Sequence, residues 1–168
     1  MNAVVAAWFV AVGIVGGGSV QAPVELDRTL QRVYGTAIMA SDLKQVRELR
    51  LLSEAGAGDQ AVLTALENRL LVLREVSRVS PEEPGPEAIA ERRAAWRAGL
   101  PAGTDVAAVM ARVGMSEQAL NGWFRDDLRT AAYMDQRFGR TAPADRANMI
   151  AEWLRDLRRR ANLIGKQP

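Results

Sequence analysis

The side chains that most often carry out enzyme chemistry are missing from this chain. Its 168 residues include no histidine and no cysteine, which removes the common general base near neutral pH, the usual zinc ligands, thiol nucleophiles and serine–histidine triads. Adjacent acids remain at Asp126–Asp127 and Glu82–Glu83. Neighbouring helical residues point about 100° apart, so the first pair does not converge on one substrate atom. The second pair lies in a proline-rich connector.

No glycine-rich phosphate-binding motif follows a predicted strand either. The sequence therefore predicts a protein without enzymatic activity, metal or small-molecule cofactor. An enzyme that uses carboxylates alone is the rival hypothesis. It requires a cleft that holds an acid with a shifted pKa.

Large apolar side chains are the groups left for recognition. Methionine and aromatic residues make adaptable contacts with varied unfolded segments. Met110, Met115, Trp123 and Tyr133 are the candidate residues of a peptide-binding groove. The competing interpretation places each of them in the hydrophobic core, because several lie on the apolar faces of predicted helices.

A hairpin is expected to position the first of these helices. Residues 30–33 and 37–39 are short extended runs, and Tyr34-Gly35 between them can supply the turn because glycine tolerates positive φ. Ser41 is the predicted N-cap of the next helix. Asp42 then places a carboxylate at the positive end of the helix dipole.

Apolar residues at spacings of three and four predict five to six helices in all. The connector at residues 80–86, SPEEPGP, links two of them and does not separate domains. The predicted helices cover residues 43–52, 59–78, 87–98, 106–113 and 116–138, followed by a last helix that begins at Pro143.

The N-terminus has the pattern of a secretory leader. Residues 1–22 carry no charged side chain, and 3–15 is an uninterrupted apolar run. This run is shorter than the roughly 20 residues that span a bilayer, so the pattern predicts a signal peptide over 1–22 and export. Pro23 directly after the expected cleavage point leaves alternatives open: cleavage after Gly18, a leader retained as a membrane tether, or a buried apolar helix.

Residues 23–168 are long enough for one domain with a single core, held without disulfides. The charges nearly balance, with 22 basic and 20 acidic residues, which is not the composition of a nucleic-acid-binding protein. The basic cluster Arg155, Arg158, Arg159 and Arg160 is interpreted as the complement of a helix C-terminus.

The hairpin and the residues after it resemble the N-terminal domain of SurA-type periplasmic chaperones, a fold related to the peptide-binding region of trigger factor. Tyr34 departs from the asparagine or aspartate usual at that position of the family. The tail at residues 152–164 resembles the closing helix and strand of that family, which implies that residues 161–164 form a C-terminal strand beside the hairpin. The matching hairpin residues are Leu30, Val33, Gly35, Ile38, Ser41, Asp42 and Leu43.

In SurA-type chaperones, parvulin isomerase domains lie between the helical part and the closing helix. Here only residues 139–145 occupy that position, too few for a domain, so the resemblance implies the peptide-binding part without the isomerase. The expected fold is mainly α, with a small antiparallel sheet formed by the N-terminal hairpin and the C-terminal strand. The expected function is to hold unfolded envelope or outer-membrane proteins. The alternative is an interaction subunit with one dedicated envelope partner, or a homodimer.

Overall fold

The computed structural model of the protein describes residues 27–79 and 82–163. Its first elements are β1 (Thr29–Val33) and β2 (Thr36–Met39), which pair antiparallel around a two-residue turn. Both turn residues have positive φ, 49° at Tyr34 and 89° at Gly35, as a type I′ turn requires. The hairpin predicted from the sequence is therefore confirmed, with a non-glycine residue at the first turn position.

Helix α1 (Ala40–Glu48) follows β2 directly and begins earlier than predicted. Met39 occupies the N-cap position, and its amide donates to Oδ2 of Asp42 at 2.7 Å. Asp42 therefore lies in the first turn as expected. Ser41 is not the N-cap, because its hydroxyl instead donates to the carboxylate of Asp27.

The remaining helices follow the predicted order, and local signals mark their ends. Ser116 and Asp105 act as N-caps, each accepting a backbone amide at 3.1 Å. Gly114 closes one helix with a φ of 67°. After α1 come a 3-10 turn (Ser53–Gly56), which the sequence did not predict, and then α2 (Asp59–Val79), α3 (Pro86–Ala98), α4 (Val106–Val113), α5 (Glu117–Phe138) and α6 (Pro143–Arg160).

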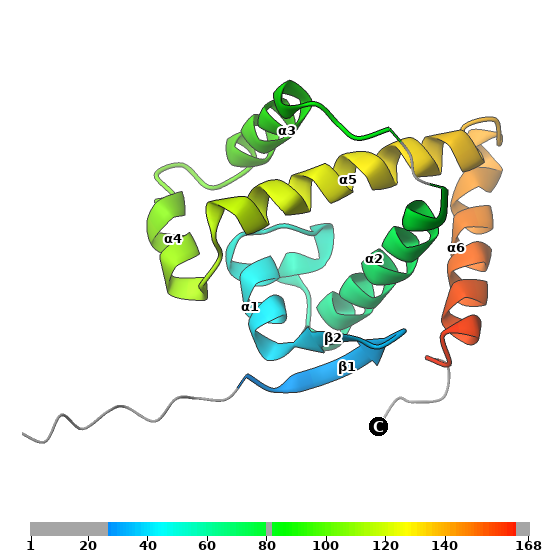
Figure 1. Ribbon diagram of the computed structural model, residues 1–168, viewed down its shortest axis with the longest axis horizontal. Helices are drawn as coiled ribbons and strands as arrows, with labels where there is room; N and C mark the ends of the chain where they lie inside the picture. The colour runs from blue at the N-terminus through cyan, green and yellow to red at the C-terminus, as the bar shows by residue number, and fades with distance from the viewer. Residues whose placement is uncertain (1–26, 80–81, 164–168) are drawn as a thin grey trace, which may run out of the picture.

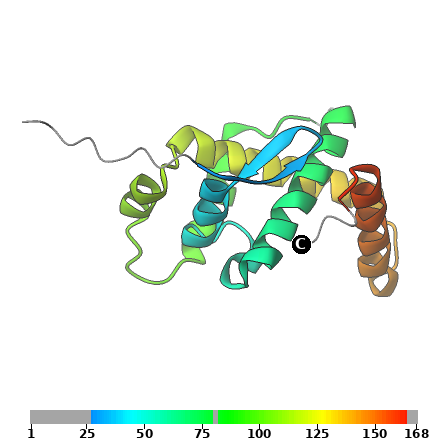
Figure 2. The ribbon, with the colours of Figure 1, turned by 90° about the horizontal axis from the view of Figure 1, so that it is seen from below.

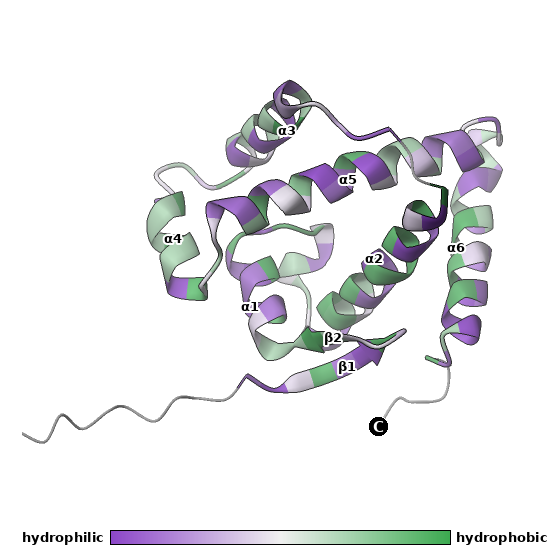
Figure 3. Cartoon of the chain, viewed as in Figure 1, coloured by the Kyte–Doolittle hydropathy of each residue, from purple (hydrophilic) through white to green (hydrophobic). Residues whose placement is uncertain are grey.

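Helix α5 is the long element that organises the others. It runs across the molecule with α3 on one side, and α1 and α2 lie between it and the hairpin (Figure 1). Trp96 of α3 packs its ring 5.4 Å from that of Phe124 of α5. Its indole N–H also donates to the carbonyl of Leu49, at the end of α1. The apolar stripes of these helices face one another and form one core (Figure 3). The mainly α fold with a small antiparallel sheet agrees with the predicted class.

Helix α6 covers the far end of α5 and one side of α2. The ring of Trp153 lies 6.0 Å from Tyr133 and 5.6 Å from Phe138. On α2, the buried Glu67 carboxylate meets Nη2 of Arg158 at 2.7 Å. An aromatic cluster and a buried ion pair therefore fasten α6 to the rest of the domain.

The predicted C-terminal strand is wrong for residues 161–163. Within the described residues the sheet has two strands, and the chain after α6 forms a turn. Asn162 adopts a φ of 56°, and the amides of Asn162 and Leu163 donate to the carbonyls of Arg159 and Arg158, both at 3.0 Å. This is the Schellman closure of a helix, which uses the backbone groups that a strand would offer. Ile164 lies outside the described residues.

The predicted leader, residues 1–22, also lies outside the described residues, so its role stays a prediction. Among the helices that the structure does describe, none combines the length and apolarity that a bilayer crossing needs.

Candidate functional site

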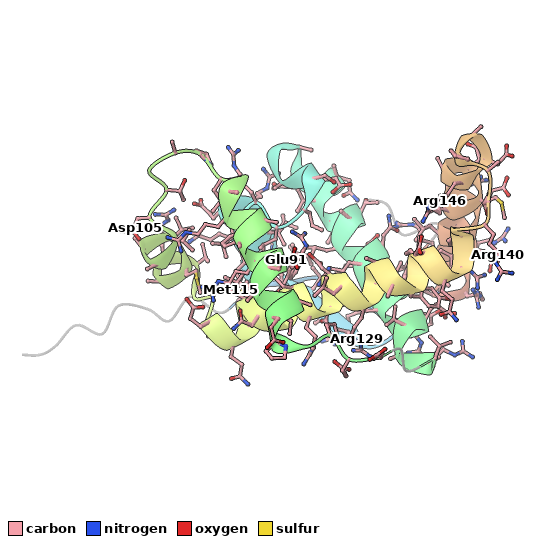
Figure 4. The ribbon with its side chains drawn as sticks, turned by 90° about the horizontal axis from the view of Figure 1, so that it is seen from above. Glu91, Asp105, Met115, Arg129, Arg140 and Arg146 are labelled. Carbon is pink, nitrogen blue, oxygen red and sulfur yellow. The ribbon has the colours of Figure 1, made fainter. Side chains whose placement is uncertain are left out.

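Two of the four predicted binding residues form the closure of α4. Met110 and Met115 are 5% and 9% exposed, and the Met115 amide donates to the Met110 carbonyl at 3.0 Å. This Schellman geometry brings the side chains at the two positions together. Met115 lies in the turn between α4 and α5 (Figure 4). Both methionines are core residues, and the structure does not place them on a binding surface.

The third predicted residue, Tyr133, is buried as well, with 7% exposure. Trp153 of α6 covers it. The side of α5 that carries Tyr133 is therefore taken up by a neighbouring helix.

Trp123 is the one predicted residue that lies at a groove. Its side chain is partly exposed, and the Arg69 guanidinium stacks 3.8 Å from its ring centroid. Arg69 also donates to the Trp123 carbonyl at 3.0 Å. The ring is thus held at the boundary between α2 and α5, with part of its surface open.

The groove beside Trp123 is a hollow of about 390 Å³ between β2, α2 and α5. It continues toward the hairpin turn into a second hollow of about 280 Å³, because Thr36, Leu70 and Leu73 line both. We call the two together the hairpin groove. Figure 2 views the molecule from the hairpin side. The apolar lining of the larger hollow comprises Ala37, Ile38, Leu66, Leu70, Leu73, Ala119, Gly122 and Trp123.

Sequence reasoning missed most of this lining. Leu70 and Leu73 follow the apolar spacing of α2, a pattern that favours burial in the core, yet both stay partly exposed. Gly122 could have indicated the groove from the sequence. A glycine inside a helix lowers the stability of the helix by about 0.5–1 kcal/mol relative to alanine, so its presence there suggests another role. Its position beside the groove shows where the missing side chain leaves space.

The charged side chains of the larger hollow already have partners within the chain. Asp42 accepts the Met39 amide, and Arg125 lies 3.5 Å from Asp126. Arg69 pairs with Asp127. A charged ligand would have to displace one of these partners, so the lining favours an uncharged apolar occupant.

Asp127 is the centre of a clamp that fixes this side of α5. One carboxylate oxygen pairs with Arg69 of α2, and the other accepts from Arg92 of α3 at 3.0 Å. The neighbouring Asp126 instead faces Arg125 and Arg129. The two adjacent carboxylates therefore face different partners, as the helical geometry predicts.

A separate hollow of about 390 Å³ lies between the start of β1, α1 and the start of α2. Leu30, Leu43 and Leu63 give it an apolar base, but its rim is charged. Asp59 pairs with Arg47 at 2.8 Å across this rim. No aromatic side chain lines it, so the hairpin groove is the better candidate site.

The two acids whose pKa is shifted do not line any of these hollows. Hydrogen bonds from Ser41 lower the pKa of Asp27, and hydrogen bonding from Arg159, with the charge of Arg160 nearby, lowers the pKa of Asp156. Within residues 27–79 and 82–163, no group of acidic side chains is arranged so that it could hold a metal ion. Searches with the chain match no family model, no curated protein and no solved structure.

Proposed function

We propose that this domain is a non-catalytic, chaperone-like module that holds unfolded segments of envelope proteins, including outer-membrane proteins, in the periplasm. The observation that carries the proposal is the hairpin groove, where a partly exposed tryptophan and two leucines meet beside a strand. Apolar burial is non-directional and contributes about 25 cal/mol per Å². Such a surface accepts many sequences and needs no nucleotide.

The charge arrangement supports this choice of ligand. Because Asp42, Arg69 and the Arg125–Asp126 pair are already satisfied within the chain, the groove offers little to a phosphate, a nucleic acid or a charged metabolite. Unfolded outer-membrane proteins expose alternating apolar residues in extended segments. Their chemistry suits a narrow, mostly apolar groove.

The resemblance to SurA-type chaperones supports the same proposal. The connection between α5 and α6 is Gly139–Ala142, which leaves no room for an isomerase domain at that position. The proposed activity is therefore binding alone. The predicted signal peptide supports a periplasmic site of action, and fractionation of cells that express the full chain tests that part separately.

The test is suppression of aggregation when a urea-unfolded outer-membrane β-barrel protein is diluted into buffer with the purified protein. Trp123→Ala removes the aromatic wall of the groove. Met149→Ala is the matched control, because Met149 is 46% exposed on α6 and lies outside the groove. We expect wild type and Met149→Ala to protect at near-stoichiometric ratio and Trp123→Ala to protect less, when all three are compared at a temperature at which each is fully folded.

Absence of protection by the wild type contradicts the holdase proposal. An interaction subunit, with one dedicated partner or with a second copy, then explains the same fold better. Analytical ultracentrifugation separates the two forms, because only a homodimer changes mass in the purified protein.

A further inference from the structure

We infer that a bound polypeptide adds to the hairpin as a third strand, pairing its backbone with the open edge of β2 at Ala37. This inference rests on the proposed function and specifies its binding mode. It identifies the ligand class as an extended, uncharged, mainly apolar segment that is recognised through its backbone as well as its side chains.

The pairing register shows which backbone groups of β2 are open. In a hairpin with a two-residue turn, the residues that flank the turn exchange hydrogen bonds, and the next opposed pair does not. Val33 and Thr36 flank the turn, so Arg32 and Ala37 are the next opposed pair. The Arg32 amide donates to its neighbour Gln31 Oε1 at 3.1 Å, which agrees with this pattern. The N–H and C=O of Ala37 therefore point away from β1.

The open edge of β2 faces the hairpin groove. Thr36, Ala37 and Ile38 are consecutive, and successive side chains of a strand point to opposite faces. All three nevertheless line the same hollow. A hollow that touches three consecutive strand residues runs along the edge of the strand, where its backbone groups lie.

The edge is short and closed at both ends. At Met39 the amide is already bound by Asp42, and at the turn Nη1 of Arg32 donates to the Gly35 carbonyl. Ala37 is left with one donor and one acceptor. Two backbone hydrogen bonds exchanged with water give only weak binding, which allows clients to be released. Apolar contact with Leu70, Leu73 and Trp123 supplies the remainder.

A second copy of this chain is a poor occupant of the edge. The β2 edge lies beside side chains of α2 and α5, with Leu70 and Trp123 lining the same hollow. Two such recessed edges meet only if the helices of both copies move apart. A single extended peptide has no flanking helices, and at a strand spacing of about 4.8 Å it fits beside one edge.

The test removes the donor at Ala37 without removing a bond of the hairpin. Ala37→Pro deletes the outward N–H, and proline is tolerated at a strand edge when that N–H takes no part in the ladder. Arg32→Pro is the control on β1: it deletes an outward N–H and also the guanidinium bond to the Gly35 carbonyl, but leaves the backbone groups of Ala37 unchanged. The probe is a fluorescein-labelled peptide of about eight residues with alternating valine and threonine, blocked at both ends. Its dissociation constant is measured by fluorescence anisotropy.

We expect Ala37→Pro to weaken peptide binding about tenfold, and Arg32→Pro to stay within about twofold of wild type. In the wild type, the hydrogen exchange of the Ala37 amide should slow when the peptide is added. This second measurement decides the matter if Ala37→Pro fails to fold.

The failures of the two proposals are distinguishable. If the wild type binds the peptide and Trp123→Ala weakens binding, while Ala37→Pro does not, strand addition is overturned and the groove proposal stands. If the wild type neither binds the peptide nor suppresses aggregation, both fall. An Ala37 amide that is protected without peptide, in a protein that sediments as a dimer, overturns the inference in favour of self-pairing.

Discussion

The two halves of α5 carry similar aromatic side chains and meet different surroundings. In the second half, Tyr133 and Phe138 are covered by Trp153 of α6. In the first half, Phe124 is covered by Trp96 of α3, but Trp123 faces the hairpin across a hollow that stays open. The difference lies in the partner element, since a helix fills the space over one half and a two-stranded hairpin does not fill it over the other.

This contrast suggests that the second half of α5 serves mainly the stability of the fold and the first half mainly ligand binding. A covered aromatic ring contributes to folding, and a partly covered ring at a groove has surface left for a ligand. If the interpretation is correct, substitutions in the covered half mainly change the free energy of unfolding. Substitutions in the open half change binding more than stability.

The largest expected effect is that of Trp153→Ala, which uncovers the second half of α5. We expect a loss of about 3–5 kcal/mol in the free energy of unfolding, the range for truncating a buried tryptophan. Trp123→Ala should cost less, about 1–2 kcal/mol, because that ring is only partly buried. Urea denaturation followed by circular dichroism measures both. Equal losses for the two variants would contradict the proposed difference between the two halves of α5.

The second test removes the ion pair that fastens α6 to α2. Arg158→Met leaves the Glu67 carboxylate buried and unpaired. We expect a cost of about 3 kcal/mol, the lower end of the range for a broken buried pair, because the Arg158 side chain is still 19% exposed. The double variant Glu67→Leu, Arg158→Met should recover most of this loss in the same denaturation assay. No recovery would mean that Arg158 acts mainly through Asn68, its other partner.

Local signals in the sequence predicted most of the fold. Tyr34-Gly35 was predicted as the hairpin turn and is confirmed, and Asp105, Ser116 and Gly114 each mark a helix end through their own side chain or backbone. The C-terminal strand came from the family resemblance and failed at residues 161–163. There Asn162, a residue that tolerates positive φ, closes α6.

The site could not be predicted to the same degree, because burial depends on which elements pack together. The sequence shows that Trp123 and Tyr133 both lie within α5. It does not show that α6 covers Tyr133, or that Trp123 lies at a hollow shared with the hairpin. The burial of Met110 and Met115 was missed for a related reason. Gly114 between them adopts a left-handed backbone conformation, and both side chains lie in the core.

A third prediction compares the two adjacent carboxylates in the first half of α5. Asp127→Asn keeps the shape of the clamp but removes the charge that Arg69 and Arg92 share. We expect a loss of about 1–2 kcal/mol in the free energy of unfolding. The control Asp126→Asn, whose ion-pair contacts are 3.5 and 4.0 Å, should stay within about 0.5 kcal/mol of wild type. A control loss as large as that of Asp127→Asn contradicts the special role of the clamp.

A fourth prediction separates stability from binding in a single residue. A Cβ at Gly122 meets no atom within 4 Å, so Gly122→Ala should stabilise α5 by about 0.5–1 kcal/mol. The same methyl group enters the hairpin groove and should lower the affinity for the valine–threonine peptide. The reverse substitution Ala132→Gly, at an exposed site in the second half, should lose a similar amount of stability and leave affinity unchanged. If Gly122→Ala is more stable and binds equally well, the ligand does not occupy this part of the groove.

The smallest expected effect concerns the acids that flank the two halves, Asp27 beside the hairpin and Asp156 on α6. Hydrogen bonds from Ser41 lower the pKa of Asp27, and those from Arg159 lower the pKa of Asp156. A carboxyl with a lower pKa in the folded protein stabilises it above the unfolded value of 3.8, and this stabilisation is lost as the pH falls through the folded pKa. Urea midpoints of Asp27→Asn and Asp156→Asn should therefore lie slightly below wild type at about pH 6 and converge with it near pH 2–3.

Because each acid bonds within its own region, the double variant should show the sum of the two small effects. A larger combined loss would mean that the hairpin and α6 are coupled through α5, and the open and covered halves would then not be independent.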